Sequence, residues 1–165
     1  MSATPQRMFA SALARLHDAK ILSRNLETAS DAPVLLSILG FEILLKCALI
    51  LSSAPAAKTH RYVKLWNALP DGARKEILDV ANARMSGHAD LSDIEKLLNW
   101  YQYIFEKVRY PYEMFEGYSL QEEKDLGELW ISLGAPTEEA LIQYYPMELA
   151  CLIAGVRSYV ERRVA

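Results

Sequence analysis

A long apolar stretch, from Pro33 to Ser53, constrains the fold of this chain more than any other part of the sequence. Every position from Val34 to Leu51 is apolar except Ser37, Gly40, Glu42 and Lys46. A helix with no polar face must be surrounded by other helices or by lipid. The length would just reach across a bilayer, but two charges near its middle would each cost about 2.5 to 3.5 kcal/mol there. The stretch therefore predicts the buried central helix of a folded domain.

The composition fits a single folded domain. A chain of 165 residues can bury a sizeable core but is short for two domains, and 52% hydrophobic with 24% charged residues excludes a disordered chain. The net charge of -3 argues against a generally basic nucleic-acid binder, although a local basic patch remains possible. The sequence has no signal-peptide pattern and no lipidation motif, so we expect a cytoplasmic protein without membrane contact.

Amphipathic helical patterns lie on both sides of the central stretch, and no alternating run is long enough to indicate a strand. Ser92 with Glu95 and Ser119 with Glu122 have the spacing of capping boxes. The expected flanking helices cover residues 5–26, 60–69, 71–85, 92–109, 119–134 and 146 onward. We predict an all-α, single-domain bundle, residues 1–165, with four or five longer helices around the buried central one.

Common catalytic and metal-binding motifs are missing from the sequence. It contains no Gly-rich phosphate loop, no HExxH and no GxSxG. The histidines at positions 17, 60 and 88 lie on different predicted elements, and we interpret His17 and His88 as surface residues. Cys47 and Cys151 lie in apolar helical runs, where a free thiol behaves as a small hydrophobe. The sequence therefore predicts no metal, no cofactor and no disulfide framework.

Several polar residues are not explained by contact with solvent alone. Glu42 and Lys46 lie one turn apart with the acid N-terminal, which is the favourable order for an ion pair. They either neutralise each other where the helix meets solvent, or face a cleft where they orient a ligand or a histidine. Arg109 and Glu113 flank a turn stiffened by Pro111, where they form either a local salt bridge or part of a site.

His60 belongs to the densest basic stretch before the last helix. The basic residues at the start of this short predicted helix are Lys58, His60, Arg61 and Lys64. Free N–H groups at a helix start favour an anion and disfavour the imidazolium. A neutral His60 could bind or deprotonate a group close to a phosphate. Alternatively, His60 is only a structural hydrogen bonder that packs against Glu42 or Tyr62.

At these residues the chain resembles the HEPN (higher eukaryote and prokaryote nucleotide-binding) domains. The similarity lies between Pro33 and Glu113, in Gly40-Phe41-Glu42-Ile43-Leu44-Leu45-Lys46, in Thr59-His60 and in Arg109-Tyr110-Pro111-Tyr112-Glu113. The resemblance implies an all-α bundle that often dimerises and functions centred on RNA or nucleotides. Many members are metal-independent ribonucleases of defence or toxin-antitoxin systems, and others only bind.

The ribonuclease members carry an Arg followed, after a polar residue, by a His. Here Arg84 and His88 are too close for that motif, and no histidine follows Arg109. The family's catalytic pair therefore cannot be transferred to this chain, and whether the protein is an enzyme stays open at this point.

Three functions are compatible with these residues. The first is binding of RNA or a nucleotide by Glu42, Lys46, His60, Arg61, Arg109 and Glu113, with a tyrosine stacking on a base. The second is a metal-independent ribonuclease toxin with His60 as general base and Arg109 stabilising the phosphorane. The third is a homodimerisation or partner-binding module, for example for an antitoxin, which uses an exposed patch of Tyr118, Trp130, Tyr144 and Tyr145.

Overall fold

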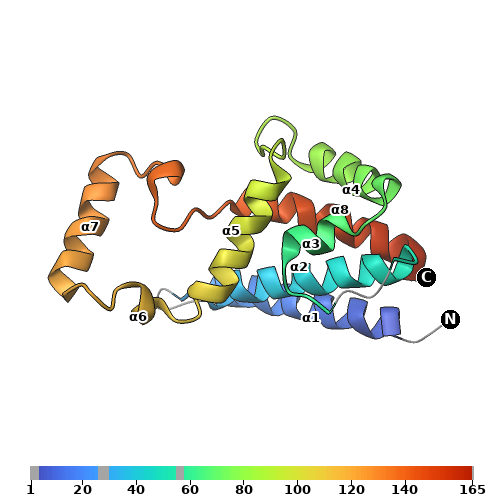
Figure 1. Ribbon diagram of the computed structural model, residues 1–165, viewed down its shortest axis with the longest axis horizontal. Coiled ribbons are helices and arrows are strands. Elements are labelled where there is room, and N and C mark those ends of the chain that lie inside the picture. The colour runs from blue at the N-terminus through green and yellow to red at the C-terminus, as the bar shows by residue number, and fades with distance from the viewer. Residues whose placement is uncertain (1–3, 26–29, 55–57, 165) are drawn as a thin grey trace.

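The computed structural model describes residues 4–25, 30–54 and 58–164, and these residues are all-α, as the sequence predicts. The order is α1 (Thr4–Asn25), α2 (Ala32–Leu51), α3 (Tyr62–Asn67), α4 (Asp71–Arg84), α5 (Ile94–Lys107), α6 (Pro111–Met114), α7 (Leu120–Ser132), the 3-10 turn η1 (Thr137–Glu139) and α8 (Pro146–Val164). Five longer helices, α1, α2, α4, α5 and α8, form the body of the molecule (Figure 1).

Helix α2 lies in the core of this body. It packs most extensively against α1 and α8 and also touches α3 and α5. Phe41, which is fully buried, meets the rings of Tyr62 and Tyr101 edge-on, each with 6.4 Å between ring centroids. Such pairs contribute about 0.5–1.5 kcal/mol beyond their burial. By length and composition α2 could also cross a membrane, and half of its apolar window is buried inside the protein.

Two glycines allow close approach between helices. A Cβ at Gly40 of α2 would lie 2.9 Å from the side chain of Leu16 on α1, whereas a Cβ at Gly155 of α8 would lie 2.4 Å from the backbone oxygen of Ile77 on α4. The second contact is with backbone, so α4 and α8 can keep this spacing only because residue 155 lacks a side chain.

The helix ends follow local capping chemistry, with one difference from the sequence prediction. The capping box of Ser119 and Glu122 at the start of α7 is confirmed. The capping box predicted for Ser92 is wrong, because α5 begins one residue later, where the Asp93 carboxylate accepts from the Lys96 N–H at 2.9 Å. A carboxylate at this position also interacts favourably with the positive end of the helix dipole.

Residues 111–145, which we call the arm, connect α5 to α8, and α7 within the arm stands away from the body. No residue of α7 is buried, and Figure 1 shows α7 standing apart from the other helices, with α5 between it and α4. The arm contains eight acidic residues and one lysine, a net charge of -7, whereas the rest of the chain has 17 Lys and Arg against 13 Asp and Glu, a net charge of +4. The modest overall charge thus hides an acidic arm on a basic body.

Candidate functional site

The carboxylate of Glu42 is the centre of the candidate site. Glu42 is only 3% exposed, and its Oε1 lies 2.7 Å from Lys46 Nζ and 2.7 Å from His60 Nδ1. The Lys46 contact follows from the one-turn spacing on α2, and the His60 contact follows because α3, which starts two residues after His60, packs on α2. We call these three residues the Glu42 cluster.

The pairing defines the state of the His60 ring. An ionised carboxylate can only accept hydrogen bonds, so Nδ1 carries the proton and donates it to Glu42. When the ring carries no second proton, Nε2 is an acceptor. The His60 side chain is 75% exposed, so the ring is both oriented by a buried acid and accessible to a ligand.

Two buried polar atoms beside the cluster form no hydrogen bond of normal geometry within the described residues. They are Glu42 Oε2 and the Tyr62 hydroxyl. Burial, followed by the negative charges of Glu42 and Glu106, raises the pKa of Tyr62, whereas the positive charge of Arg109 lowers it. Tyr62 therefore stays protonated as a donor, and Arg109 lies within electrostatic range of the same buried hydroxyl.

Arg109 is held by aromatic rings rather than by an acid. Its guanidinium lies 4.9 Å from the centroid of the Phe105 ring and 5.6 Å from that of Tyr110. Cation–π contacts at exposed sites contribute about 0.5–1 kcal/mol. Glu113 is exposed on α6, and the described residues contain no ion pair between it and Arg109. The local salt bridge that the sequence left as an alternative is therefore not formed.

Arg61 is also exposed, immediately before α3, where its backbone N–H donates to Thr59 Oγ1 at 3.1 Å. Of the six residues predicted as ligand-binding, the structure thus joins Glu42, Lys46 and His60 by direct contact, whereas Arg109 is linked to them only by the effect of its charge on the pKa of Tyr62. The side chains of Arg61 and Glu113 form no hydrogen bond or ion pair with this cluster within the described residues.

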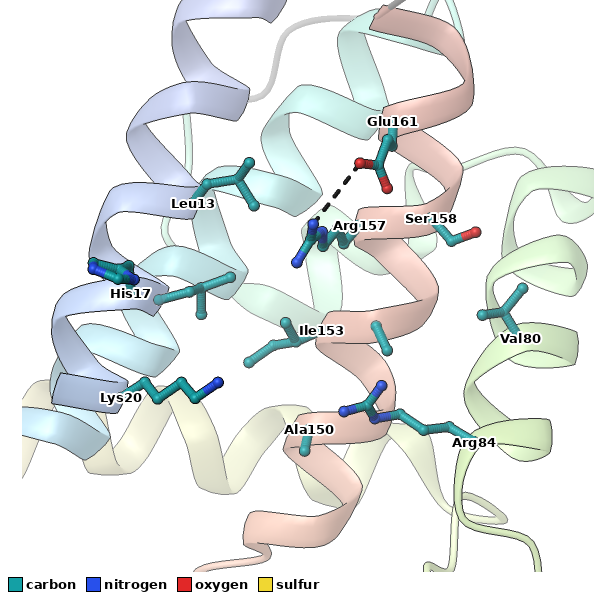
Figure 2. Close-up of a pocket in the computed structure, with 12 residues that line it drawn as sticks. Leu13, His17, Lys20, Val80, Arg84, Ala150, Ile153, Arg157, Ser158 and Glu161 are labelled. Carbon is teal, nitrogen blue, oxygen red and sulfur yellow. Dashed lines mark ion pairs between the residues drawn. The ribbon is translucent and has the colours of Figure 1, made fainter. Parts of the chain in front are cut away.

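A second candidate site, which the sequence analysis missed, is a groove of about 700 Å³ between α1, α4 and α8 (Figure 2). Its sides carry His17, Lys20, Arg84 and Arg157 around an apolar floor. Arg157 pairs with Glu161 at 3.8 Å, whereas the other three form no ion pair within the described part of the chain. His17 is exposed, as predicted, and so is Arg84, and they come together with two further cations from three different helices.

Neither thiol fits a catalytic role. Cys47 and Cys151 are both buried and free, and burial raises the pKa of the Cys47 thiol to about 11. The thiolate is the reactive form, so Cys47 is a weak nucleophile at neutral pH. Among the residues that the structure describes, no group of three or more His, Cys, Asp or Glu is arranged to hold a metal ion.

The chain was compared with protein-family models, with curated proteins and with solved structures, and none of these comparisons finds a match. A function for this chain is therefore inferred from the Glu42 cluster and from the distribution of charge.

Proposed function

We propose that this protein is a HEPN-like domain that binds RNA or a nucleotide through its phosphate groups at the Glu42 cluster, in a defence or toxin-antitoxin type system. The observation that supports the proposal is the buried Glu42 carboxylate, which holds Lys46 and His60 at 2.7 Å each. Polar side chains whose positions are fixed before binding lose less conformational entropy when a ligand arrives.

The charge around the cluster favours a phosphate. From residue 42 to residue 64 the chain contains four Lys and Arg residues and one acid, Glu42. Lys58, Arg61 and Lys64 are all exposed in this segment. Glu42 is the acid of this segment, and it is already paired with Lys46 and His60. Lys58, Arg61 and Lys64 therefore remain available to a phosphate backbone.

Bases can be accommodated by aromatic rings near Arg109. Tyr110 is 43% exposed and Tyr112 is 70% exposed, and their ring centroids are 6.1 Å apart. Unpaired bases stack on such rings in single-stranded RNA complexes. The ligand would then place its phosphates at the basic segment and a base against Tyr110 or Tyr112.

Titration of labelled single-stranded RNA, with the fold checked by circular dichroism, tests the proposal. We expect binding at low salt that weakens as salt rises, because released counterions contribute to binding. His60→Ala and Arg61→Ala should each weaken binding about five-fold, the equivalent of about 1 kcal/mol per lost contact. Lys75→Ala is the matched control, since Lys75 is 77% exposed on α4 and pairs only with Asp79. If wild type does not bind at low salt, the proposal is wrong.

RNA cleavage is a second candidate function, which the contact between Glu42 and His60 favours. A carboxylate that fixes the Nδ1–H of a histidine leaves Nε2 as a general base. In this reaction Nε2 takes the proton of a ribose 2′-hydroxyl, the 2′-oxygen attacks the adjacent phosphorus, and the bond to the 5′-oxygen of the next nucleotide breaks. That oxygen takes a proton from water, and His60 then returns its proton to water. Arg109 would stabilise the negative charge of the phosphorane. Unchanged RNA cleavage by His60→Ala would exclude this role for His60.

A further inference from the structure

The arm exposes an unusual amount of apolar surface. On α7 and at its end, Leu126, Leu129, Ile131 and Leu133 are between 45% and 67% exposed, and Leu120 at its start is 84% exposed. Isolated exposed leucines are common, but a concentration of this kind marks an interaction surface. The Tyr118 and Trp130 that the sequence predicted for such a patch are exposed here, whereas Tyr144 and Tyr145 are half-buried against the core.

The arm keeps its shape through its own contacts. The capping box fixes the start of α7, and the Trp130 indole N–H donates to the Pro136 carbonyl at 3.1 Å. A hollow of about 440 Å³ lies between α7 and the following loop, lined by Phe115, Tyr118, Leu126, Trp130, Leu141 and Ile142. A surface that is already shaped by contacts within the chain can receive a partner without first folding, which lowers the entropy cost of binding.

Charge restricts what can cover this surface. Two arms packed on each other would bring together two segments of -7 each, and like charges in contact disfavour association. The arm therefore requires a partner surface that is apolar in its centre and basic at its rim.

The groove between α1, α4 and α8 is such a surface on the same chain. Leu13, Val80 and Ile153 contribute to its apolar lining, while Lys20 and Arg84 lie at its sides without ion-pair partners among the described residues (Figure 2). Figure 1 shows α7 and α4 on opposite sides of α5, so the arm of one chain is held away from its own groove.

We propose that the arm of one copy docks into the groove of a second copy. The apolar side of α7 covers the groove floor, and the acidic residues of α7 face Lys20 and Arg84. If both arms are exchanged, the result is a closed two-fold dimer, because the same two surfaces meet twice. The interface is separate from the Glu42 cluster and does not depend on the proposed RNA binding.

Sedimentation of the full-length chain and two double variants tests this interface. The arm variant Leu126→Asp/Leu129→Asp and the groove variant Lys20→Glu/Arg84→Glu change exposed side chains, so both should stay folded. We expect wild type to dimerise, less tightly at high salt, and each variant alone to be monomeric. Mixing the two variants should give a 1:1 complex, because one supplies an intact arm and the other an intact groove.

Lys75→Glu, a charge reversal on the exposed part of α4 outside the groove, is the control and should dimerise like wild type. A monomeric wild type, an arm variant that dimerises like wild type, or a mixture of the two variants that does not associate would overturn the proposal. RNA titration of the same variants keeps the two proposals apart, since neither variant alters the Glu42 cluster.

Discussion

Substitution of Gly155 by alanine should destabilise the fold although alanine is the better helix former. The added Cβ would lie 2.4 Å from the backbone oxygen of Ile77, 3.1 Å from its Cγ2 and 3.2 Å from Ala81 Cβ. Relief requires α4 to move away from α8. Overpacking of this kind costs about 1–3 kcal/mol, and contact with backbone places the cost near the upper end. The gain in helix propensity offsets about 1 kcal/mol, so the net loss in free energy of unfolding is about 2 kcal/mol.

Thermal unfolding followed by circular dichroism measures this effect. For a chain of this size, about 2 kcal/mol corresponds to a decrease in Tm of about 4–8 °C. Gly127→Ala is the matched control, because a Cβ at this position of α7 meets nothing within 4 Å and should leave the Tm unchanged or slightly raised. If Gly155→Ala is as stable as wild type, α4 and α8 do not cross at this distance and the described packing is wrong.

Three further predictions concern buried and paired groups. Glu42→Gln should lower the free energy of unfolding by about 1–3 kcal/mol, because it removes the negative charge that contacts both Lys46 and His60. Urea unfolding measures this change, and a transition with the same midpoint and slope as wild type would contradict it. The hydrogen bond from Arg163 lowers the pKa of Glu76, so ionised Glu76 stabilises the fold above its unfolded-state pKa, and this contribution is lost as the pH falls through the lowered folded-state pKa. Glu76→Gln should therefore be less stable by up to about 1 kcal/mol at neutral pH and equal to wild type in strong acid, and an equal deficit at both pH values in thermal melts would refute the linkage. Cys47, whose pKa burial raises to about 11, should react with a thiol reagent only after denaturation, and rapid labelling of the native protein would show that it is not buried.

The central helix could be predicted because few folds can cover a helix with no polar face. The contact between Glu42 and Lys46 follows from their one-turn spacing alone. The contact between Glu42 and His60 depends on α3 packing back onto α2, and no local sequence pattern encodes this packing. The sequence therefore indicated the contact only as one of two interpretations of His60. The capping prediction at Ser92 failed because Asp93, the next residue, is an equally good cap, and spacing does not distinguish the two.

The sequence predicted that Tyr118 and Trp130 are exposed, but it revealed neither the arm as a whole nor the groove. Leu126, Leu129 and Leu133 repeat with the spacing of an ordinary packed helix, and a helical pattern does not tell whether its apolar side is covered. The groove depends on how α1, α4 and α8 cross, so its cations appear in the sequence as unrelated surface charges. Only the difference in net charge, -7 for the arm against +4 for the rest of the chain, can be obtained from the sequence alone.

The most direct test of the central claim uses the three histidines as probes of three places on the molecule. His60 belongs to the Glu42 cluster, His17 lines the groove, and His88 is exposed in the turn after α4. Long-range ¹H–¹⁵N spectra of the imidazoles, recorded while single-stranded RNA is added, report on each place separately. We expect His60 to carry a proton on Nδ1 and its signals to move on addition of RNA, while those of His88 stay in place. A His60 protonated on Nε2 instead, or signals of His60 that do not respond to RNA, would contradict this expectation.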